Sequence, residues 1–360
     1  MLRPWRGHRT ASVPGPNRER KCAAPVPYRR GPDVSEVKAF PRSADRITVQ
    51  PSSTTGPQAG GLHRGHALRR LLDAHLAWLA QRPDGVRADF SGATLSDAQL
   101  EGVNLSRARF RGTSMIEAVL IGADLIGAEI EGCDLRQASL SRADMAGASL
   151  TNSDCSLSRL EGTNLSEATL HSSKFRSAEL GSARLLEARI RECDFRGAVL
   201  TAAGLNQSNV FDTSFADTNM EGAVFYHSHM QLCRFIGAIA TDANFGNAHL
   251  ESCDLRGAAL SGSKFYRAEL TRSCLGRTLM AGCDLREAKL GGVDFTGATL
   301  TNALLEGAVL FAADLRGADL RGARGMTGLQ LSQARTDSDT VLPSGARGPY
   351  LRGSGAERPA

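Results

Sequence analysis

Residues 123–150 read ADLIGAEIEGCDLRQASLSRADMAGASL, and every fifth residue from Leu125 to Leu150 is large and apolar. Two residues before each of these positions stands a small residue, which is Cys133 in one case and Ala in the others. The position between the two is often acidic, as in Asp134. The stretch is therefore built from a five-residue unit that reads A-[D/N]-L-x-x.

The same unit extends far beyond this stretch. It runs from Phe90 to Leu320 without an insertion or deletion, which makes 47 consecutive units. Only Cys155 and Ala240 depart from a large apolar residue at the fifth-residue position. Gly fills the last position of the unit 19 times, which suits a tight turn with positive φ. An internal repeat of this regularity predicts one elongated domain over residues 87–322.

The period also predicts how the chain folds. Residues two apart on an extended strand point to the same side, so the small and the large residue of each unit face inward together. Five is an odd period, so each unit must end in a corner. Phenylalanines recur at intervals of 20 residues, or four units, which predicts a four-sided parallel β-helix of nearly 12 coils. The two series lie on opposite sides of the core and comprise Phe175, Phe195, Phe215 and Phe235, and Phe225, Phe245 and Phe265.

These A-[D/N]-L-x-x units resemble the pentapeptide-repeat protein family, and the match covers about two-thirds of the chain. The resemblance implies a right-handed quadrilateral β-helix, an all-β solenoid with short α-helical caps. It implies a bacterial, non-enzymatic protein that binds another protein. Some members mimic duplex DNA and bind type II topoisomerases, which is an alternative function. A secreted effector is a second alternative.

Both ends of the repeat carry sequences typical of caps, which an open coil needs to cover its apolar core. Residues 61–86 contain a helical apolar stripe with Leu72, and we expect Trp78 to plug the first coil. In residues 323–343, Thr327 to Gln330 resembles a capping box that opens a helix carrying Leu329. The segment after this helix resembles the tail of many family members.

Residues 1–60 and 344–360 have the composition of disordered tails. The first 60 residues hold nine of the 13 prolines, and residues 1–87 carry 16 basic and six acidic residues, against 22 and 29 in residues 88–322. The N-terminal segment is interpreted as a solvated tail, with an anion- or nucleic-acid-binding arm, a targeting or secretion leader, or a miscalled start as alternatives. No apolar run suggests a membrane span, and we expect a cytoplasmic protein.

No motif predicts catalysis, a cofactor or a structural metal. Five of the eight cysteines replace Ala at the small inward position, which is typical of core residues. Cys233 and Cys253 should be neighbours in adjacent coils, so a redox or metal role for them is the alternative. His229 and His249 should stack, with His227 around the nearby corner. These three imidazoles are either a polar surface ladder or a metal site.

The charges bear on the DNA-mimic hypothesis. We assign the units in turn to faces one to four, starting with the unit that contains Phe90. The outward residues of the four faces then carry net charges of −1, −1, −3 and −2. No face is a continuous acidic stripe, so we expect only weak resemblance to a polyanion. We also expect no direct nucleic-acid binding by the repeat domain, in which acidic residues outnumber basic ones. Asp is often followed two residues later by Arg, which predicts exposed ion pairs. They are Asp134/Arg136, Asp194/Arg196, Asp254/Arg256 and Asp314/Arg316.

Two surfaces are candidates for binding a protein, either a different chain or a second copy in a homodimer. Face three has nine charged residues, against 13, 17 and 12 on faces one, two and four, and it displays apolar residues outward. These are Val119, Ile121, Val199, Ile239 and Leu279. The second candidate is a band that holds outward aromatic and aliphatic residues, of the kind enriched in interface hot spots. It comprises Phe211, Tyr226, Leu232, Ile236 and Tyr266. For either surface, the alternative to a binding site is that these are isolated exposed apolar residues of an ordinary protein surface.

Overall fold

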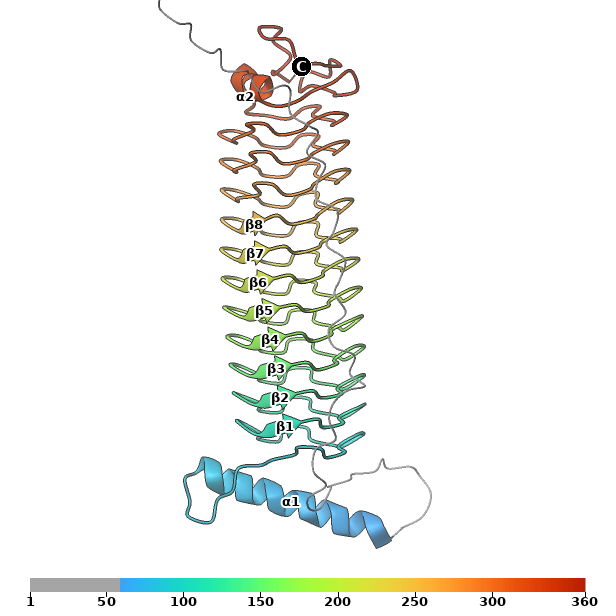
Figure 1. Cartoon of the computed structure of the whole chain (residues 1–360), viewed down its shortest axis with the longest axis vertical. Helices are drawn as coiled ribbons and strands as arrows, with labels where there is room; N and C mark the ends of the chain where they lie inside the picture. The colour runs from blue at the N-terminus through green and yellow to red at the C-terminus, as the bar shows by residue number, and fades with distance from the viewer. Residues whose placement is uncertain (1–58, 360) are drawn as a thin grey trace, which may run out of the picture. The chain divides into compact units, whose positions relative to one another are not determined.

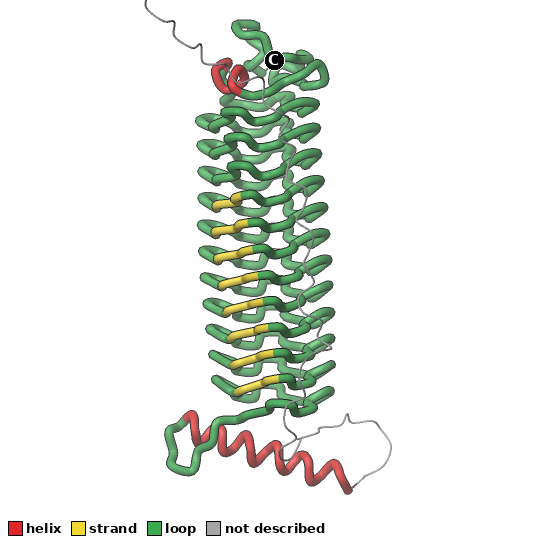
Figure 2. The backbone as a smooth tube through the Cα atoms, in the orientation of Figure 1, coloured by secondary structure: helices red, strands yellow, loops and turns green. Residues whose placement is uncertain are grey.

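The computed structural model describes residues 59–359 and contains a parallel β-solenoid, as the five-residue period predicts. Eight three-residue strands form one parallel sheet in the order β1 to β8, and their coils stack one above another (Figures 1 and 2). The strands are β1 (Arg109–Arg111), β2 (Glu129–Glu131), β3 (Ser149–Thr151), β4 (Thr169–His171), β5 (Arg189–Arg191), β6 (Asn209–Phe211), β7 (His229–Gln231) and β8 (His249–Glu251).

Each strand pairs with the strand 20 residues further along, for example Phe110 with Ile130. All eight strands lie on face one. The other three faces are joined by isolated parallel bridges with the same offset of 20, from Thr94↔Ser114 to Leu304↔Arg324. One coil is therefore four units, and the prediction of a four-sided parallel solenoid is confirmed.

The corner after each buried large residue is made by a residue in the left-handed region. It is glycine at many corners, such as Gly92 with φ 69°, but also Asp97 with φ 58°, Leu157 with φ 62° and Ala202 with φ 55°. A positive φ is energetically costly for β-branched residues, and proline cannot adopt it. This explains why Val, Ile, Thr and Pro never occupy the last position of the 47 units.

Stacked phenylalanines fill the core, and all seven predicted ladder residues are buried. Phe195 and Phe235 stack on either side of Phe215 at centroid distances of 5.1 and 5.0 Å. Phe225 approaches Phe215 edge-on at 6.5 Å, so the two ladders meet across the core. A further stack at 5.0 Å, between Phe90 and Phe110, lies in the first coils.

Several polar residues at the small inward position donate a hydrogen bond to a backbone carbonyl of the preceding coil. The hydroxyl of Thr113 donates to the carbonyl of Phe90, and that of Ser273 to the carbonyl of Leu250, in each case 23 residues earlier. The thiol of Cys133 makes the equivalent bond to the carbonyl of Phe110. Others donate to the carbonyl three residues earlier in their own coil, as Ser158 does to Cys155. Ser, Thr and Cys can therefore replace Ala because a nearby carbonyl satisfies their polar atom.

Helix α1 (Ala59–Leu79) covers the first coil, but its contact differs from the one that we expect from the sequence. Leu72 packs against the core together with Leu68 and Leu71. Trp78 is only half-buried and stacks on His75 at 5.6 Å, so the prediction that Trp78 plugs the coil is wrong. The fully buried His75 does this instead, and its Nδ1 accepts a hydrogen bond from the amide of Ala88.

Helix α2 (Gly328–Gln333) closes the opposite end and has the capping box that Thr327 and Gln330 predict. The side-chain amide of Gln330 also donates to the carbonyls of Leu305 and Ala308 in the last coils. Leu329 is 66% exposed, so it is not a cap residue as predicted; Leu331, 1% exposed, lies on the buried side of the short helix.

The segment after α2 continues the stack and is folded to residue 359. Leu315 and Leu320 donate backbone hydrogen bonds to Arg335 and Val341, as to a further coil. Beyond it, Tyr350 packs against the core and Ala356 is 8% exposed. This differs from the disorder expected for residues 344–360. That expectation rests on amino-acid composition, which contains no information on contacts with the cap. Most of the predicted N-terminal tail lies outside the described residues.

Candidate interaction surfaces

Face three carries a column of uncharged side chains on five consecutive coils, which we call the apolar stripe. Parallel bridges join Val199, Asn219, Ile239, Ala259 and Leu279 in this order. Val199, Ile239 and Leu279 are 38%, 47% and 51% exposed. Each stands one residue before a buried core residue, so the solenoid backbone holds the three in line along one side.

The other two face-three residues of the prediction lie apart from the stripe. Val119 and Ile121 flank one core residue several coils away, and both are half-buried. Between them and the stripe, the same column contains Arg159 and Glu179, which form an ion pair at 3.8 Å. The predicted face-three surface is therefore interrupted, and its exposed apolar part is the stripe.

The predicted aromatic band is divided among several faces. Phe211 belongs to strand β6 on face one, and the corner residue Leu232, which is 43% exposed, follows β7. Ile236 is half-buried and lies across the Gly237 corner from Ile239, so it adjoins the apolar stripe. The prediction of one continuous band is wrong, because successive units of a coil point in different directions.

Two members of this band, Tyr226 and Tyr266, share a column on face four and line a hollow of about 610 Å³. Gly246 lies between them, and a Cβ there would come within 3.2 Å of the Tyr226 ring. The Tyr266 hydroxyl donates to Glu287 at 3.0 Å, while Arg267 lies over its ring at 4.8 Å. Tyr266 is thus held by these two interactions within the protein, whereas Tyr226 is 42% exposed.

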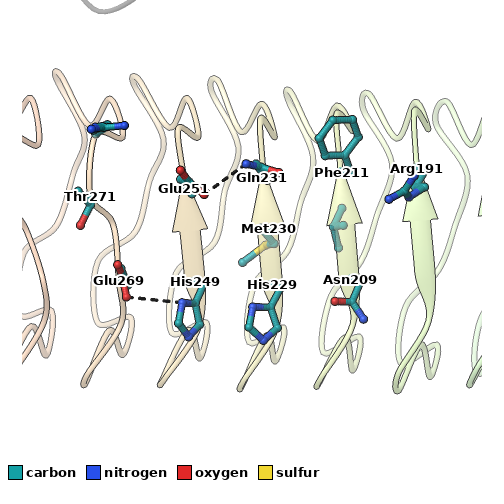
Figure 3. A pocket seen from close by; sticks show the side chains of 12 residues that line it. Arg191, Asn209, Phe211, His229, Met230, Gln231, His249, Glu251, Glu269 and Thr271 are labelled. Atoms are coloured by element: carbon teal, nitrogen blue, oxygen red, sulfur yellow. Dashed lines mark hydrogen bonds and ion pairs between the residues drawn. The ribbon is translucent and has the colours of Figure 1, made fainter.

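Phe211 lines a second hollow, of about 390 Å³, on the strand face (Figure 3). Two rows of side chains form its walls across β5 to β8, with His229 and His249 in one row and Phe211 in the other (Figure 3). The two imidazoles stack at 4.6 Å, and His249 faces Glu269 at 3.6 Å.

The third histidine, His227, stands apart from this pair, with its ring edge-on to Tyr226 at 4.4 Å. Among residues 59–359, no group of three or more His, Cys, Asp or Glu side chains is arranged to hold a metal ion. His229 and His249 therefore form a ladder of two stacked rings, and His227 is not part of it.

The predicted Asp–Arg ion pairs are confirmed. The four pairs have N–O distances of 2.6 to 2.7 Å, and Asp284/Arg286 and Asp319/Arg321 repeat the geometry. In each pair the aspartate also accepts the arginine backbone amide. The pair thus closes a local turn and neutralises the outward carboxylate.

The core cysteines are shielded from solvent. Burial raises the pKa of the thiols of Cys133 to about 11 and of Cys193 and Cys283 to about 12. Burial likewise raises the pKa of Cys253, whose thiol donates to the carbonyl of Met230. A thiol that remains protonated is a poor nucleophile and metal ligand, which favours a packing role.

None of the helices between residues 59 and 359 is long and apolar enough to cross a membrane.

A parallel solenoid with four units in each coil and regular columns of outward side chains defines a class of repeat proteins, and sequence comparison identifies the family. A family profile described as "Pentapeptide repeats" matches residues 86–181 and 228–324 in overlapping segments, which is more than half of the chain. The chain belongs to the pentapeptide-repeat family. A comparison with curated protein sequences finds no match.

Solved structures of the same kind are similar to this chain. One is HetL, a pentapeptide repeat protein involved in heterocyst differentiation regulation from the cyanobacterium Nostoc, with 24% identity, 79% of this chain and 98% of that chain covered, and a TM-score of 0.26. Another is QnrB1, a plasmid-mediated fluoroquinolone resistance protein, with 18% identity, 47% and 91% coverage, and a TM-score of 0.24. A thylakoid-lumen protein of Arabidopsis thaliana shares 28% identity over 27% of this chain and 63% of that one, with a TM-score of 0.21.

Proposed function

We propose that this protein is a non-enzymatic, rigid scaffold that binds another protein in the bacterial cytoplasm, and that the apolar stripe is its contact. The observation that carries the proposal is the alignment of Val199, Ile239 and Leu279, all more than a third exposed, in one uncharged column. Single exposed apolar residues are ordinary, but an aligned set of them on a face with few charges is typical of a binding site. Because the ladder of backbone hydrogen bonds fixes the column, little ordering is needed on binding.

The chemistry of the other candidate groups supports binding over catalysis. The core thiols are buried, which raises their pKa, and the aspartates of the Asp–Arg pairs are occupied by guanidinium groups. A catalytic carboxylate or thiol would need access to a substrate and a pKa suited to proton or electron-pair transfer.

A DNA mimic that binds a type II topoisomerase is a second candidate, and the net charge of −3 on face three favours it. Against it, the Asp–Arg pairs neutralise acidic positions on the other faces, such as Asp134 and Asp254. Imitation of duplex DNA requires dense, uncompensated charge along the rod.

The two candidates differ in what the full-length chain should capture from a lysate of its own organism. We expect the wild-type chain and an Ile126→Ser control to recover one shared protein, and an Ile239→Ser/Leu279→Ser variant to lose it. Ile126 is 42% exposed and lies on face four, outside the stripe. Recovery of the same protein by the double variant would contradict the proposed contact. Recovery of topoisomerase subunits by all three chains would favour the DNA mimic.

A further inference from the structure

Three carboxylates surround the centre of the apolar stripe, beside Ile239. Asp217 is the corner residue that precedes Asn219, and Glu221 follows the core residue of the same coil. Asp242 is the corner residue on the far side of the coil that carries Ile239. The acidic residues therefore lie on both sides of the apolar stripe.

These three carboxylates have no ion-pair partner among the residues that the structure describes, unlike the Asp–Arg pairs elsewhere. Asp217 leans toward the next coil, since a Cβ at Gly237 would come within 2.8 Å of its Oδ1. Asp242 likewise contacts the position that a Cβ at Gly262 would take. Glu221 and Asp242 contribute to the net charge of −3 that makes face three the most acidic of the four faces, and Asp217 stands at its border with face two.

The spacing of the exposed apolar residues indicates which secondary structure of a partner would fit the apolar stripe. Ile239 stands two coils from Val199 on one side and two coils from Leu279 on the other, and two coils span about 9.6 Å at a strand spacing of about 4.8 Å. In an α-helix, residues seven apart lie on one side and are separated by about 10.5 Å. In an extended strand, side chains on one face recur at about 6.8 Å, which does not match.

The size of the stripe argues against a second copy of this chain as the occupant. Five coils are roughly 24 Å long, and the stripe is roughly as wide as one helix, about 10 Å. Two such surfaces would bury on the order of 500 Å², well below the roughly 1,200 Å² of a stable protein–protein interface. A narrow element fits the stripe, and the remainder of its partner can contact the rod elsewhere.

We infer that the apolar stripe binds a basic amphipathic α-helix of the partner protein, an inference that rests on the scaffold function proposed above. Apolar residues at heptad spacing on this helix contact Val199, Ile239 and Leu279. Lys or Arg residues that flank the apolar seam pair with Asp217, Glu221 and Asp242. The carboxylates then select the charge of the helix, and the apolar residues provide most of the affinity.

Synthetic peptides test this inference on the full-length protein. The probe is a fluorescently labelled 21-residue helical peptide with Leu at heptad positions and Lys on both flanks. One comparison peptide has Glu in place of Lys, and another has the same composition with the Leu positions scrambled. Fluorescence anisotropy should show binding of the basic amphipathic peptide alone, and weaker binding at high salt.

Protein variants locate the binding on the stripe. We expect Ile239→Ser/Leu279→Ser to weaken binding by about tenfold or more, because burying one such side chain accounts for at least that factor. Asp217→Asn/Glu221→Gln/Asp242→Asn should weaken it by roughly threefold to tenfold and remove most of the salt dependence. Ile126→Ser should bind like the wild type.

Equal binding of the Lys and Glu peptides, or of the wild type and the stripe variant, would overturn the inference, as would no binding at all. The lysate capture distinguishes this failure from failure of the scaffold function. A natural partner that is lost with Ile239→Ser/Leu279→Ser, but retained when the three carboxylates are neutralised, would support the scaffold function. The same result would contradict the inference that the bound helix is basic.

Discussion

Arg196 forms an ion pair with the carboxylate of Asp194, two residues earlier in the chain, and the side chain of Asp194 is only 3% exposed. Arg176, from the preceding coil, reaches the same carboxylate at 2.6 Å. Burial alone would raise the pKa of Asp194, but the hydrogen bonds from Arg196 and Arg176 outweigh burial and hold it below its usual range. Asp194 therefore links two coils, whereas most of the Asp–Arg pairs act within one turn.

Replacing Asp194 by Asn should destabilise the fold by about 2 kcal/mol, since a buried carboxylate with two charged donors is lost. The matched control is Asp319→Asn, because the side chain of Asp319 is 23% exposed and binds one arginine. Its expected cost is under about 1 kcal/mol. The shift of the urea-unfolding midpoint at pH 7 measures both, and equal shifts would contradict the role given to burial.

The pH dependence of this difference follows from the lowered pKa. A carboxyl whose pKa is lower in the folded chain contributes stability above its unfolded pKa of about 3.9 and loses it as the pH falls. The cost of Asp194→Asn should thus be full at pH 7 and should shrink below about pH 4. A cost that does not change with pH would show that the shape of the carboxylate, not its charge, matters.

Phe215 should be the most sensitive residue of the phenylalanine ladders. It stacks between Phe195 and Phe235 and contacts Phe225 edge-on, whereas Phe175, at the end of the same ladder, stacks on Phe195. We expect Phe215→Ala to cost about 3–5 kcal/mol, with Phe175→Ala at or below the lower end of this range.

Urea unfolding followed by circular dichroism checks the order of the two variants. Phe215→Leu should recover much of the loss, because it leaves a smaller cavity than Ala. A larger cost for Phe175→Ala than for Phe215→Ala would mean that the ladder ends, rather than its middle, limit stability.

The repeat predicts the fold because one physical constraint recurs in every unit. The inward position of Leu125, the small residue at Ala123 and the turn at Gly127 each follow from the five-residue period. The caps lack this redundancy. Leu329 and Leu331 stand on one short helix, and the sequence alone does not tell which of them contacts the last coil.

Gly325 joins the last coil to α2 and should tolerate no side chain. Its φ is +75°, and an added Cβ would lie 2.7 Å from the backbone nitrogen of Glu306. Gly325→Ala should therefore destabilise the C-terminal cap by roughly 2–3 kcal/mol through backbone strain together with the clash. Gly345→Ala, at φ +87° with open space, should cost only about 1 kcal/mol.

Thermal unfolding of the two variants measures the difference, and limited proteolysis should show earlier cleavage near α2 in Gly325→Ala. Similar melting temperatures for both variants would indicate that Glu306 can move aside.

The candidate site was less predictable than the fold, for reasons that particular residues illustrate. Counting charges by face points to Ile239 and Leu279, because outward positions follow directly from the period. The periodic pattern does not show that Tyr266 is held by Glu287 and Arg267, or that Ile236 lies beside the stripe across a corner. These contacts depend on how long side chains lean between coils, which the five-residue period does not specify.

His75 should make the N-terminal cap sensitive to pH. Burial lowers the pKa of this imidazole, whose Nδ1 accepts the amide of Ala88, so the folded cap requires the neutral form. A histidine whose pKa is lower in the folded state is fully stabilising above its unfolded pKa of about 6.5. As the pH falls below this value the open cap gains a proton, so α1 should detach more readily from the first coil.

Hydrogen exchange of the Ala88 amide measures this opening, after correction for the intrinsic pH dependence of exchange. Protection should fall by up to about tenfold between pH 7.5 and pH 5.5, because an imidazole with the ordinary pKa of about 6.5 in the open cap is roughly tenfold more often protonated than neutral at pH 5.5. His75→Asn keeps a hydrogen-bond acceptor without a titratable ring, so its protection should change little over this range. Leu76→Ser, at an exposed position of α1, should behave like the wild type. The same pH dependence in His75→Asn would assign the opening to another group.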